Sequence, residues 1–325
     1  LIAQGHEVSV ELSVNDDVLT EGISLFQPDL IICPFLKDKI PEDIWRNHVC
    51  IIVHPGIKGD RGPSSMDWAI LNQEDQWGAT AIQAGDVFDA GDIWATREFN
   101  RRPVSKGRMY RHEVMEAGIE VIMMTLKRYA SGTYVPEPLD YTRDDVTQRS
   151  RPSMSQAIRR IDWMRDDVDA IIRKIYSADN QPGVLDTLYG EEYYLYGAHR
   201  EKHLLGVPGD IIAQRDGAIC RAAVDGAVWI SHLRKKLKTP EKSFKLPATK
   251  LLADALSDVP ESPLDLLYTG TSLTFNETWY KEENSVGYLS FDFHNGAMDA
   301  GQCERLKEAF RAAAQRPTSV IVLSC

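Results

Sequence analysis

The first hundred residues alternate short apolar runs with helical patterns. Residues 8–12, 28–33 and 49–54 are apolar runs with the length expected of strands, and the last two are rich in β-branched side chains. Residues 41–47 predict a short helix that begins at a proline and carries acids in its first turn. Residues 79–94 predict two strands around a Gly/Asp turn. This alternation predicts an α/β domain with a largely parallel sheet.

Two more helices are predicted before the pattern changes. Ser64 and Asp67 have the spacing of a capping-box-like helix start in front of an apolar run. Residues 108–130 repeat apolar side chains at the spacing of one buried helix face. Residues 131–157 are then rich in Pro, Arg, Asp and Ser, a composition that predicts a linker.

The second half of the chain has a different hydrophobic pattern, with one helix followed by short alternating runs. Residues 161–178 predict an amphipathic helix. Four short alternating runs follow the Pro182-Gly183 pair, separated by glycines at a spacing of roughly 8–12 residues. Such a series predicts a small β-barrel-like domain.

The last quarter predicts a connector and a further unit. Residues 246–285 contain several prolines and predict a connector with one short helix. From Val286 a strand, a turn, a helix and a second strand follow one another to the end of the sequence. These elements predict the start of another α/β unit.

We therefore expect four segments, and the pattern of both ends is that of interrupted elements. The opening residues have the pattern of a helix end that leads into a second strand, so an N-terminal strand is expected to be missing from the first domain. The last unit is expected to be truncated. The predicted segments are an α/β domain, a barrel-like domain, a linker and a truncated α/β domain, at 1–145, 146–240, 241–285 and 286–325.

Composition agrees with a folded, non-membrane protein. Hydrophobic residues make up 43% and charged residues 26% of the 325 residues. No apolar stretch approaches the ~18 residues of a membrane span. The five cysteines are odd in number and have no metal-clip spacing, which favours a reducing cytoplasm and predicts no metal site. The net charge of −11 argues against a nucleic-acid partner.

One basic stretch departs from this acidic balance. Residues 232–245 carry six Lys or Arg and one Glu. A solvated linker face is the default interpretation. The alternative is that Lys235, Lys236 and Lys238 attract a phosphate-bearing ligand.

The candidate chemistry lies in two segments. His54 ends an apolar strand, where open α/β sheets bind ligands, and a loop with Gly56, Gly59 and Gly62 follows it. Asp86, Asp89 and Asp92 crowd the turn of residues 79–94. Turn aspartates usually cap their own backbone, so at least two of them are expected to be structural and one can face His54.

Together these residues resemble a known family. His54, the glycine loop with Arg61-Gly62, the Trp68-Ala69-Ile70 run, Gly78-x-Thr80 and Asp89-Ala90-Gly91-Asp92-Ile93 resemble the 10-formyltetrahydrofolate-dependent formyltransferases. The resemblance implies a formyltransferase-type, Rossmann-like first domain. Residues 155–237 are similar to the C-terminal barrel domain of methionyl-tRNA formyltransferase, and residues 286–325 resemble the opening of a crotonase (enoyl-CoA hydratase) domain.

A formyltransferase joined to a crotonase resembles a family of hydrogenase maturation factors. The resemblance implies transfer of the formyl group of 10-formyltetrahydrofolate to coenzyme A, and release of carbon monoxide from formyl-CoA for NiFe-hydrogenase maturation. It implies contact with the hydrogenase maturation machinery. The family's pattern implies His54 and Asp89 as the catalytic pair, with substrate contacts at Phe35, Leu36, Lys37, Gly56, Asp86, Val87 and Phe88.

One position departs from the family pattern. Formyltransferases usually carry Asn two residues before the catalytic His, and here that position is Ile52. Losing one oxyanion donor can cost about 2.7–4 kcal/mol of transition-state stabilisation. Two alternatives therefore stay open: another formyltransferase or hydrolase, with a tRNA or sugar-amine acceptor, and a non-catalytic folate-binding module.

Overall fold

The computed structural model describes residues 1–237, 243–269 and 274–325, and the chain divides into two compact units. Unit 1 comprises residues 1–103 and 109–154, and unit 2 comprises residues 104–108 and 155–325. Helix α4 (Lys106–Arg111) crosses this division. The four segments expected from the sequence stay a prediction, and each unit is described by itself.

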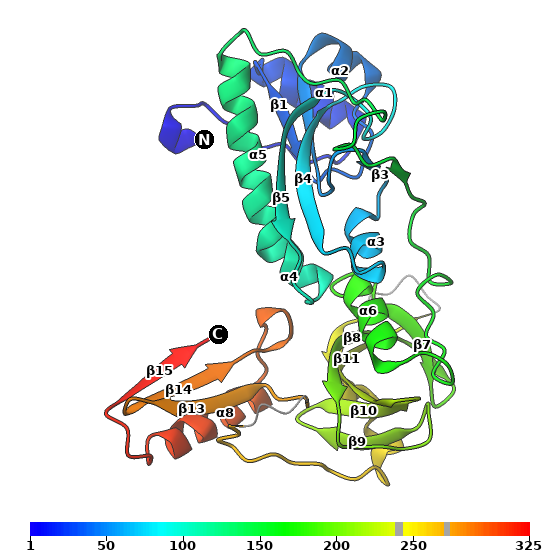
Figure 1. Ribbon diagram of the computed structural model, residues 1–325, viewed down its shortest axis with the longest axis vertical. Helices are drawn as coiled ribbons and strands as arrows, with labels where there is room; N and C mark the ends of the chain where they lie inside the picture. Colours follow the sequence, from blue (N-terminus) through cyan, green and yellow to red (C-terminus); the bar gives the residue numbers. More distant parts are fainter. Residues whose placement is uncertain (238–242, 270–273) are drawn as a thin grey trace. The chain divides into compact units, whose positions relative to one another are not determined.

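Unit 1 is built around a four-stranded sheet with the order β1-β2-β4-β5 (Figure 1). Its strands are β1 (Ile31–Pro34), β2 (Cys50–His54), β4 (Gln76–Gln83) and β5 (Ile93–Asn100). Its helices are α1 (Asp16–Phe26), α2 (Glu42–Asn47), α3 (Ser65–Leu71) and α5 (Glu113–Ala130), with a short 3-10 turn η1 (Ile2–Gln4). A separate two-residue pair joins β3 (Asp60–Arg61) to β6 (Arg149–Ser150).

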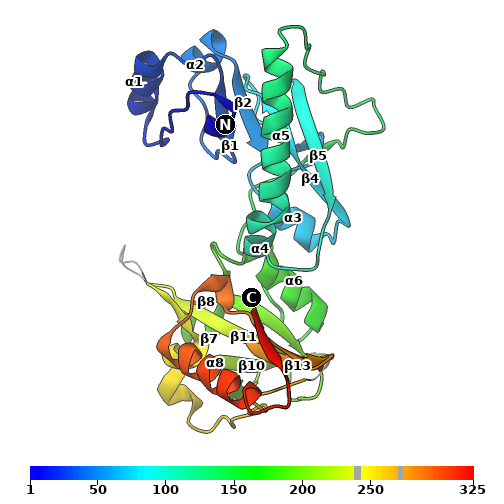
Figure 2. The same cartoon turned by 90° about the vertical axis from the view of Figure 1, so that its left-hand side faces the viewer.

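Unit 1 has three layers, with helices packed on both sides of the sheet, because its strands are apolar on both faces. Ile51 and Val53 of β2 face α5, where Ala117 and Val121 are buried. On the other face Ile52 lies in a cluster with residues of α1 and α2. Figure 2 shows α1 and α2 on one side of unit 1 and α5 on the other. Strand residues alternate between faces, so one strand supplies both halves of the core.

The α/β fold is confirmed, but the sheet is mixed rather than largely parallel. Only β1 and β2 run parallel, whereas β4 is antiparallel to both β2 and β5. The turn between β4 and β5 explains their opposite directions, because strands joined by a hairpin are antiparallel. The antiparallel pairing of β4 with β2 is made across the chain segment that contains β3 and α3.

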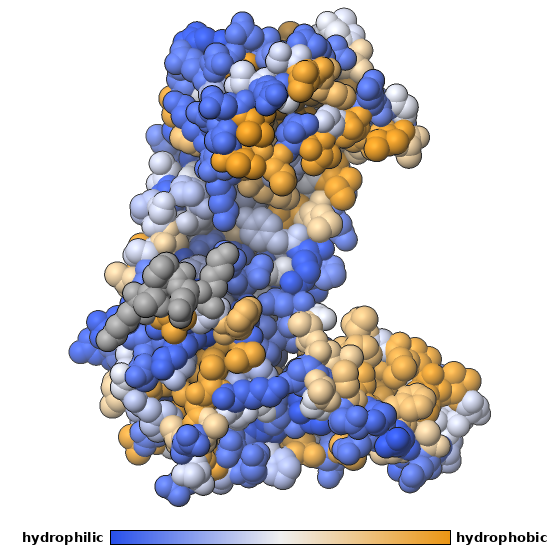
Figure 3. Space-filling model, turned by 180° about the vertical axis from the view of Figure 1, so that it is seen from behind, coloured by the Kyte–Doolittle hydropathy of each residue, from blue (hydrophilic) through white to orange (hydrophobic). Residues whose placement is uncertain are grey.

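Three local expectations in unit 1 were wrong. Residues 8–12 form no strand, and their side chains are exposed because no neighbouring strand pairs with them in the described part of the chain. Apolar side chains gather on a visible face of this unit (Figure 3). Helix α3 starts after Ser64 as expected, but the capping box is not formed, since the Ser64 hydroxyl accepts a hydrogen bond from Met154 N at 2.9 Å instead. The helix expected at 108–130 is broken at His112 into α4 and α5.

Unit 2 contains the expected run of antiparallel strands. Their order is β7-β8-β11-β10-β9, with β12 added beside β11. The bounds are β7 (Val184–Leu188), β8 (Glu191–Glu201), β9 (Ile211–Arg215), β10 (Ala218–Ala223), β11 (Gly226–Lys235) and β12 (Lys245–Pro247). Helix α6 (Val168–Ala178) packs its buried Ile171 and Ile175 into the core of this sheet.

Helix α6 is shorter than the 161–178 expected. Asp167 caps it by accepting from Ala170 N at 2.6 Å. Upstream, Asp162 and Asp166 accept hydrogen bonds from nearby backbone amides. Aspartate side chains that bind local backbone compete with helix formation, which explains the late start.

The last elements form a sheet of their own, ordered β13-β14-β15. Here β13 (Thr278–Glu283) is antiparallel to β14 (Val286–Phe291), which is parallel to β15 (Val320–Ser324). Helix α8 (Ala300–Ala313) begins at a capping box of Asp299 and Gln302. The connector predicted at 246–285 thus contains a strand, β13, besides α7 (Ala248–Leu252), η2 (Ala253–Leu256) and coil; η3 (His294–Gly296) lies in the turn after β14.

Candidate functional site

The candidate site lies at the end of β2. Because β1 and β2 are parallel, their carboxyl ends share one edge of the sheet, and Phe35 N donates to Val53 O at 3.1 Å there. On the other side His54 pairs with Thr80 of β4. Polar groups at this edge meet in the position where open α/β sheets bind ligands.

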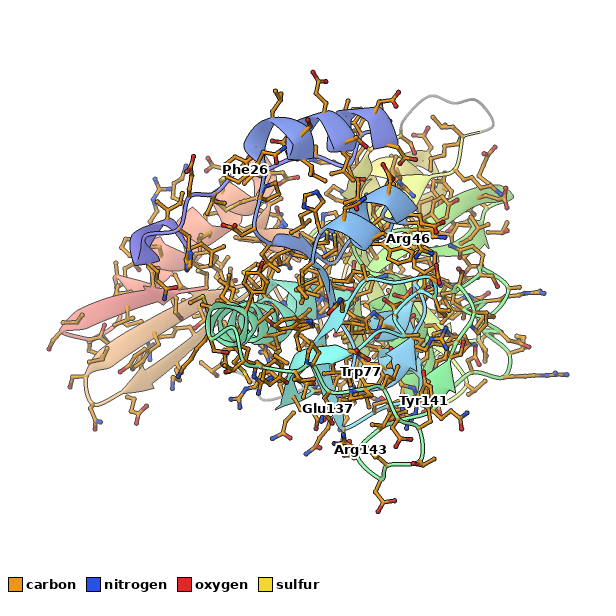
Figure 4. All side chains as sticks on the ribbon, turned by 90° about the horizontal axis from the view of Figure 1, so that it is seen from above. Phe26, Arg46, Trp77, Glu137, Tyr141 and Arg143 are labelled. Carbon is orange, nitrogen blue, oxygen red and sulfur yellow. The ribbon has the colours of Figure 1, made fainter. Side chains whose placement is uncertain are left out.

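The start of the loop after His54 is held by side chains from two elements. The carbonyl of Pro55 accepts from Trp77 Nε1 at 2.9 Å and from Ser65 Oγ at 2.8 Å. The hydroxyl of Thr80 donates to the carbonyl of Gly56 at 2.8 Å. Trp77, labelled in Figure 4, is fully buried in β4. These bonds fix the backbone beside the imidazole.

His54 lies between two carboxylates. Its Nε2 is 3.1 Å from Asp60 Oδ2, and its Nδ1 is 3.4 Å from Asp89 Oδ1. His54 is 4% exposed and Asp60 is 1% exposed, whereas the side chain of Asp89 is 13% exposed. The structure therefore brings together the two residues expected to form the catalytic pair, and adds a third.

The two carboxylates raise the pKa of the His54 imidazole. Burial alone would lower the pKa of His54, but hydrogen bonds and charges from Asp60 and Asp89 outweigh it and raise the pKa to about 9. Burial would raise the pKa of Asp89, but the hydrogen bond and charge of His54 lower it instead. At neutral pH the site holds a protonated imidazole, which can donate a hydrogen bond or a proton.

The turn that carries Asp89 is tied to the glycine loop. Asp89 has a positive φ of 51°, a conformation that aspartate tolerates better than most residues. Its Oδ2 accepts from Gly62 N at 3.2 Å, and Arg61 Nε donates to Phe88 O at 3.2 Å. The loop and the turn thus position one another.

The segment predicted as a linker covers this loop. Thr147 N donates to Lys58 O at 2.8 Å and Arg151 N donates to Arg61 O at 3.2 Å. Upstream, Lys58 pairs with Asp145 at 2.9 Å. Glu137 and Arg143, labelled in Figure 4, form an ion pair in the same segment. Part of 131–157 is therefore a packed part of unit 1, which composition alone did not reveal.

This cover explains two of the glycines. Gly59 and Gly62 have φ of +82° and +115°, and a Cβ at either position would overlap the carbonyl of Thr147 or Arg151. The glycines were expected to let backbone approach a ligand, and at these two positions they let another part of the chain approach. A Cβ on Gly56 would instead lie 2.5 Å from His54 Nε2 and 2.7 Å from Asp60 Oδ2.

Replacing Gly59 with alanine is expected to destabilise unit 1, because the methyl group adds an overlap with Thr147 O to the cost of a positive φ. Gly132→Ala is the matched control, since its φ is +63° and nothing lies within 4 Å of the added Cβ. We expect a cost of about 1 kcal/mol for the control and at least twice that for Gly59→Ala, measured by thermal unfolding. Equal losses would contradict the close approach.

The other expected substrate contacts lie around the same edge. Phe35 and Leu36 directly follow β1; Phe35 packs edge-to-face on Tyr110 at 5.8 Å, and Leu36 is packed in the α1/α2 cluster. Lys37 and Asp86 are exposed. Val87 and Phe88 are 54% and 50% exposed, so the turn presents apolar surface next to Asp89. Leu36 supports the site by packing, and its contact with substrate stays a prediction.

Ile52 and Asp60 lie close to His54 in the sequence, and the structure gives them different environments. Ile52 packs in the apolar cluster and supplies no polar group to the site. Asp60 was not among the site residues expected from the sequence, although it lies in the glycine loop after His54. Its neighbours Gly59 and Gly62 suggest a turn, and no pattern in the sequence shows that its carboxylate faces His54.

The basic stretch of residues 232–245 is largely paired where it is described. Lys235 pairs with Glu191 at 3.2 Å and Lys236 pairs with Glu192 at 2.9 Å. Lys238 lies outside the described residues. These pairs favour the solvated-face interpretation of the stretch.

Among the described residues, no helix combines the length and apolarity needed to cross a bilayer. Within the same part of the chain, no cluster of three or more His, Cys, Asp or Glu has the arrangement of a metal site.

Comparison with known proteins gives matches along the whole chain. A family model described as "Formyl transferase, C-terminal domain" matches residues 153–245. Hydrogenase maturation factor HoxX of Bradyrhizobium diazoefficiens is 43% identical over 321 residues, which is 99% of this chain and 54% of that protein. Methionyl-tRNA formyltransferase of Geobacter sulfurreducens is 26% identical over 262 residues, 77% of this chain and 81% of that protein.

One solved structure has the same fold over the whole chain. The crystal structure of HypX from Aquifex aeolicus in complex with tetrahydrofolic acid has a TM-score of 0.94 and 41% identity. The match covers 100% of this chain and 56% of that one. The chain thus spans about half the length of the HoxX and HypX proteins it matches.

Proposed function

Because this chain corresponds over nearly its whole length to part of the HypX/HoxX hydrogenase maturation factors, we propose that it transfers a formyl group from 10-formyltetrahydrofolate to coenzyme A. The observation that carries the proposal is the position of the His54 imidazole between the carboxylates of Asp60 and Asp89 at the end of β2. The tetrahydrofolic acid bound by the Aquifex relative supports the choice of donor.

The chemistry follows from the charge on the ring. The formyl group on the folate nitrogen is an amide, and attack by the acceptor thiol on its carbon creates an oxyanion. The imidazolium of His54 stabilises that oxyanion by a charge-assisted hydrogen bond. As the C–N bond breaks, His54 gives its proton to the leaving nitrogen and is restored by the proton of the thiol. The products are tetrahydrofolate and formyl-CoA.

The pterin is proposed to lie beside the exposed side chains of the 84–92 turn. Val87 and Phe88 offer apolar surface within two residues of Asp89. Phe35 and Lys37, at the end of the neighbouring parallel strand, border the same edge of the sheet.

The fate of formyl-CoA belongs to the longer protein. Its decarbonylation to carbon monoxide and free coenzyme A balances without an added reductant. We propose that this step takes place in the crotonase-like part, of which residues 286–325 form the beginning, and that the carbon monoxide serves NiFe-hydrogenase maturation.

The acceptor can be tested directly. The chain is supplied with 10-formyltetrahydrofolate and, in separate reactions, with coenzyme A, methionyl-tRNA, a sugar amine or water alone. We expect formyl-CoA, identified by mass spectrometry, and faster release of tetrahydrofolate only when coenzyme A is present. A formylated amine would replace the proposal with a tRNA- or sugar-directed enzyme, and folate binding without any turnover would indicate a binding module.

A further inference from the structure

The two carboxylates around His54 are not equivalent. Asp60 is 1% exposed and meets Nε2 at 3.1 Å, whereas the Asp89 side chain is 13% exposed and meets Nδ1 at 3.4 Å. The Asp60 contact is also covered by backbone, since a Cβ on Gly56 would lie within 2.7 Å of both His54 Nε2 and Asp60 Oδ2. The Nε2 side of the ring is therefore closed, and the Nδ1 side borders the exposed turn.

When both acids are ionised, the geometry favours a hydrogen on each of the two ring nitrogens. A carboxylate oxygen can only accept, and a neutral imidazole has one N–H. With a neutral ring, one carboxylate would face a bare nitrogen lone pair in a buried site, which is an unfavourable arrangement. Two ionised carboxylates together therefore favour the cation.

The second carboxylate oxygen of Asp60 indicates that this residue does more than form a turn. Its second oxygen, Oδ1, is buried and has no hydrogen-bond partner among the described residues. Leaving a charged acceptor unsatisfied costs free energy that a residue without a role would not be expected to bear. Ile52, on the same face of β2 as His54, is apolar and offers no donor.

We propose that Asp60 is a positioning residue that anchors Nε2 of His54 and leaves the Nδ1 hydrogen, shared with Asp89, as the one that turns toward the formyl group. This inference rests on the proposed formyl transfer and names the nitrogen that performs it. The negative charge of Asp60 keeps the His54 ring protonated. As the oxyanion forms, the Nδ1 hydrogen leaves the more exposed Asp89 and bonds to the oxyanion instead.

The charged groups that face the ring come from two elements. Asp60 approaches from β3 and Asp89 from the turn between β4 and β5, and Arg61 acts on Asp89 by its charge. The raised pKa of His54 agrees with this surrounding of two acids. Removing the charge of Asp60 should lower that pKa, because one nearby opposite charge accounts for about one to three units.

The test is nitrogen NMR of histidine-labelled chain, with His54 assigned through His54→Gln. In the wild type we expect a doubly protonated ring up to a pH near 9. In Asp60→Asn we expect the pKa to fall by about one to two units, and the neutral ring to carry its hydrogen on Nδ1. In Asp89→Asn the hydrogen of the neutral ring should instead lie on Nε2.

The pH dependence of kcat gives a second test, because a residue that only stabilised the fold would not shift it. In Asp60→Asn the alkaline limb of kcat should shift down with the ring pKa, while KM for the folate changes less than about two-fold. Glu74→Gln, which breaks the ion pairs with Arg149 and Arg151, is the matched control and should leave the titration of His54 unchanged.

Two outcomes overturn the inference. One is a wild-type ring that is neutral at pH 7.5, a measurement that needs no variant to fold. The other is an Asp60→Asn ring that titrates as in the wild type. Because the NMR needs no turnover, absent formyl transfer with the expected titrations would reject the proposed function and leave the anchoring by Asp60 standing.

Discussion

Replacing His54 with alanine is expected to lower the rate of formyl transfer at least ~100-fold, the scale of general-acid and oxyanion effects. The variant loses the imidazole that meets both carboxylates of the site. The rate is measured as tetrahydrofolate released with coenzyme A as acceptor. His112→Ala, at an exposed position before α5, is the control and should retain nearly full activity.

The wild-type rate should also depend on pH in one direction. The pKa of His54 is raised to about 9, above its ordinary value, so the ring is protonated below that pH and loses its proton above it. Activity that needs the imidazolium is therefore expected to fall as the pH rises through about 9. A rate for His54→Ala within a few-fold of the wild type would remove the histidine from the mechanism.

Replacing Asp89 with alanine is expected to cost a similar factor, about 100-fold, for two reasons. The variant removes the negative charge that faces Nδ1, and it removes the acceptor that binds Gly62 N at 3.2 Å. The ring then keeps Asp60 but loses its orientation toward the open edge. Tetrahydrofolate release is again the measurement.

The same turn provides the control for Asp89. Asp92 is exposed, and the bond it makes across the turn uses its backbone carbonyl, which accepts from Gln83 N at 2.9 Å. Asp92→Ala should stay within about two-fold of the wild type, since side chains of exposed turn residues contribute little. Equal losses in both variants would indicate that the turn, rather than the Asp89 carboxylate, is what matters.

The pattern of the sequence was sufficient for the residues whose position depends on local structure. His54 lies at the end of an apolar strand, as its local pattern predicts. Its meeting with Asp89 was expected from the family resemblance, because β4 runs antiparallel to β2 and strand ends alone would place the turn after β4 beside the start of β2. The run of strands in residues 184–235 could be predicted because alternation and glycine spacing are local signals.

Features that depend on distant pairing could not be predicted. Asp60 faces His54 within a loop whose β3 pairs with β6, 89 positions further along the chain. The direction of β4 against β2 is likewise not determined by the apolar residues of either strand. Residues 8–12 alternate like a strand, yet alternation forms a strand only where a neighbouring strand is present.

The backbone bonds from Thr147 and Arg151 to the loop after His54 bear on how this protein can be divided for study. A fragment that stopped at residue 145, where composition suggests a boundary, would keep the imidazole and both acids but lose the strand that holds their loop in place. The part of the chain that holds the candidate site is defined by what touches the loop and therefore extends at least to Arg151, six residues past that boundary.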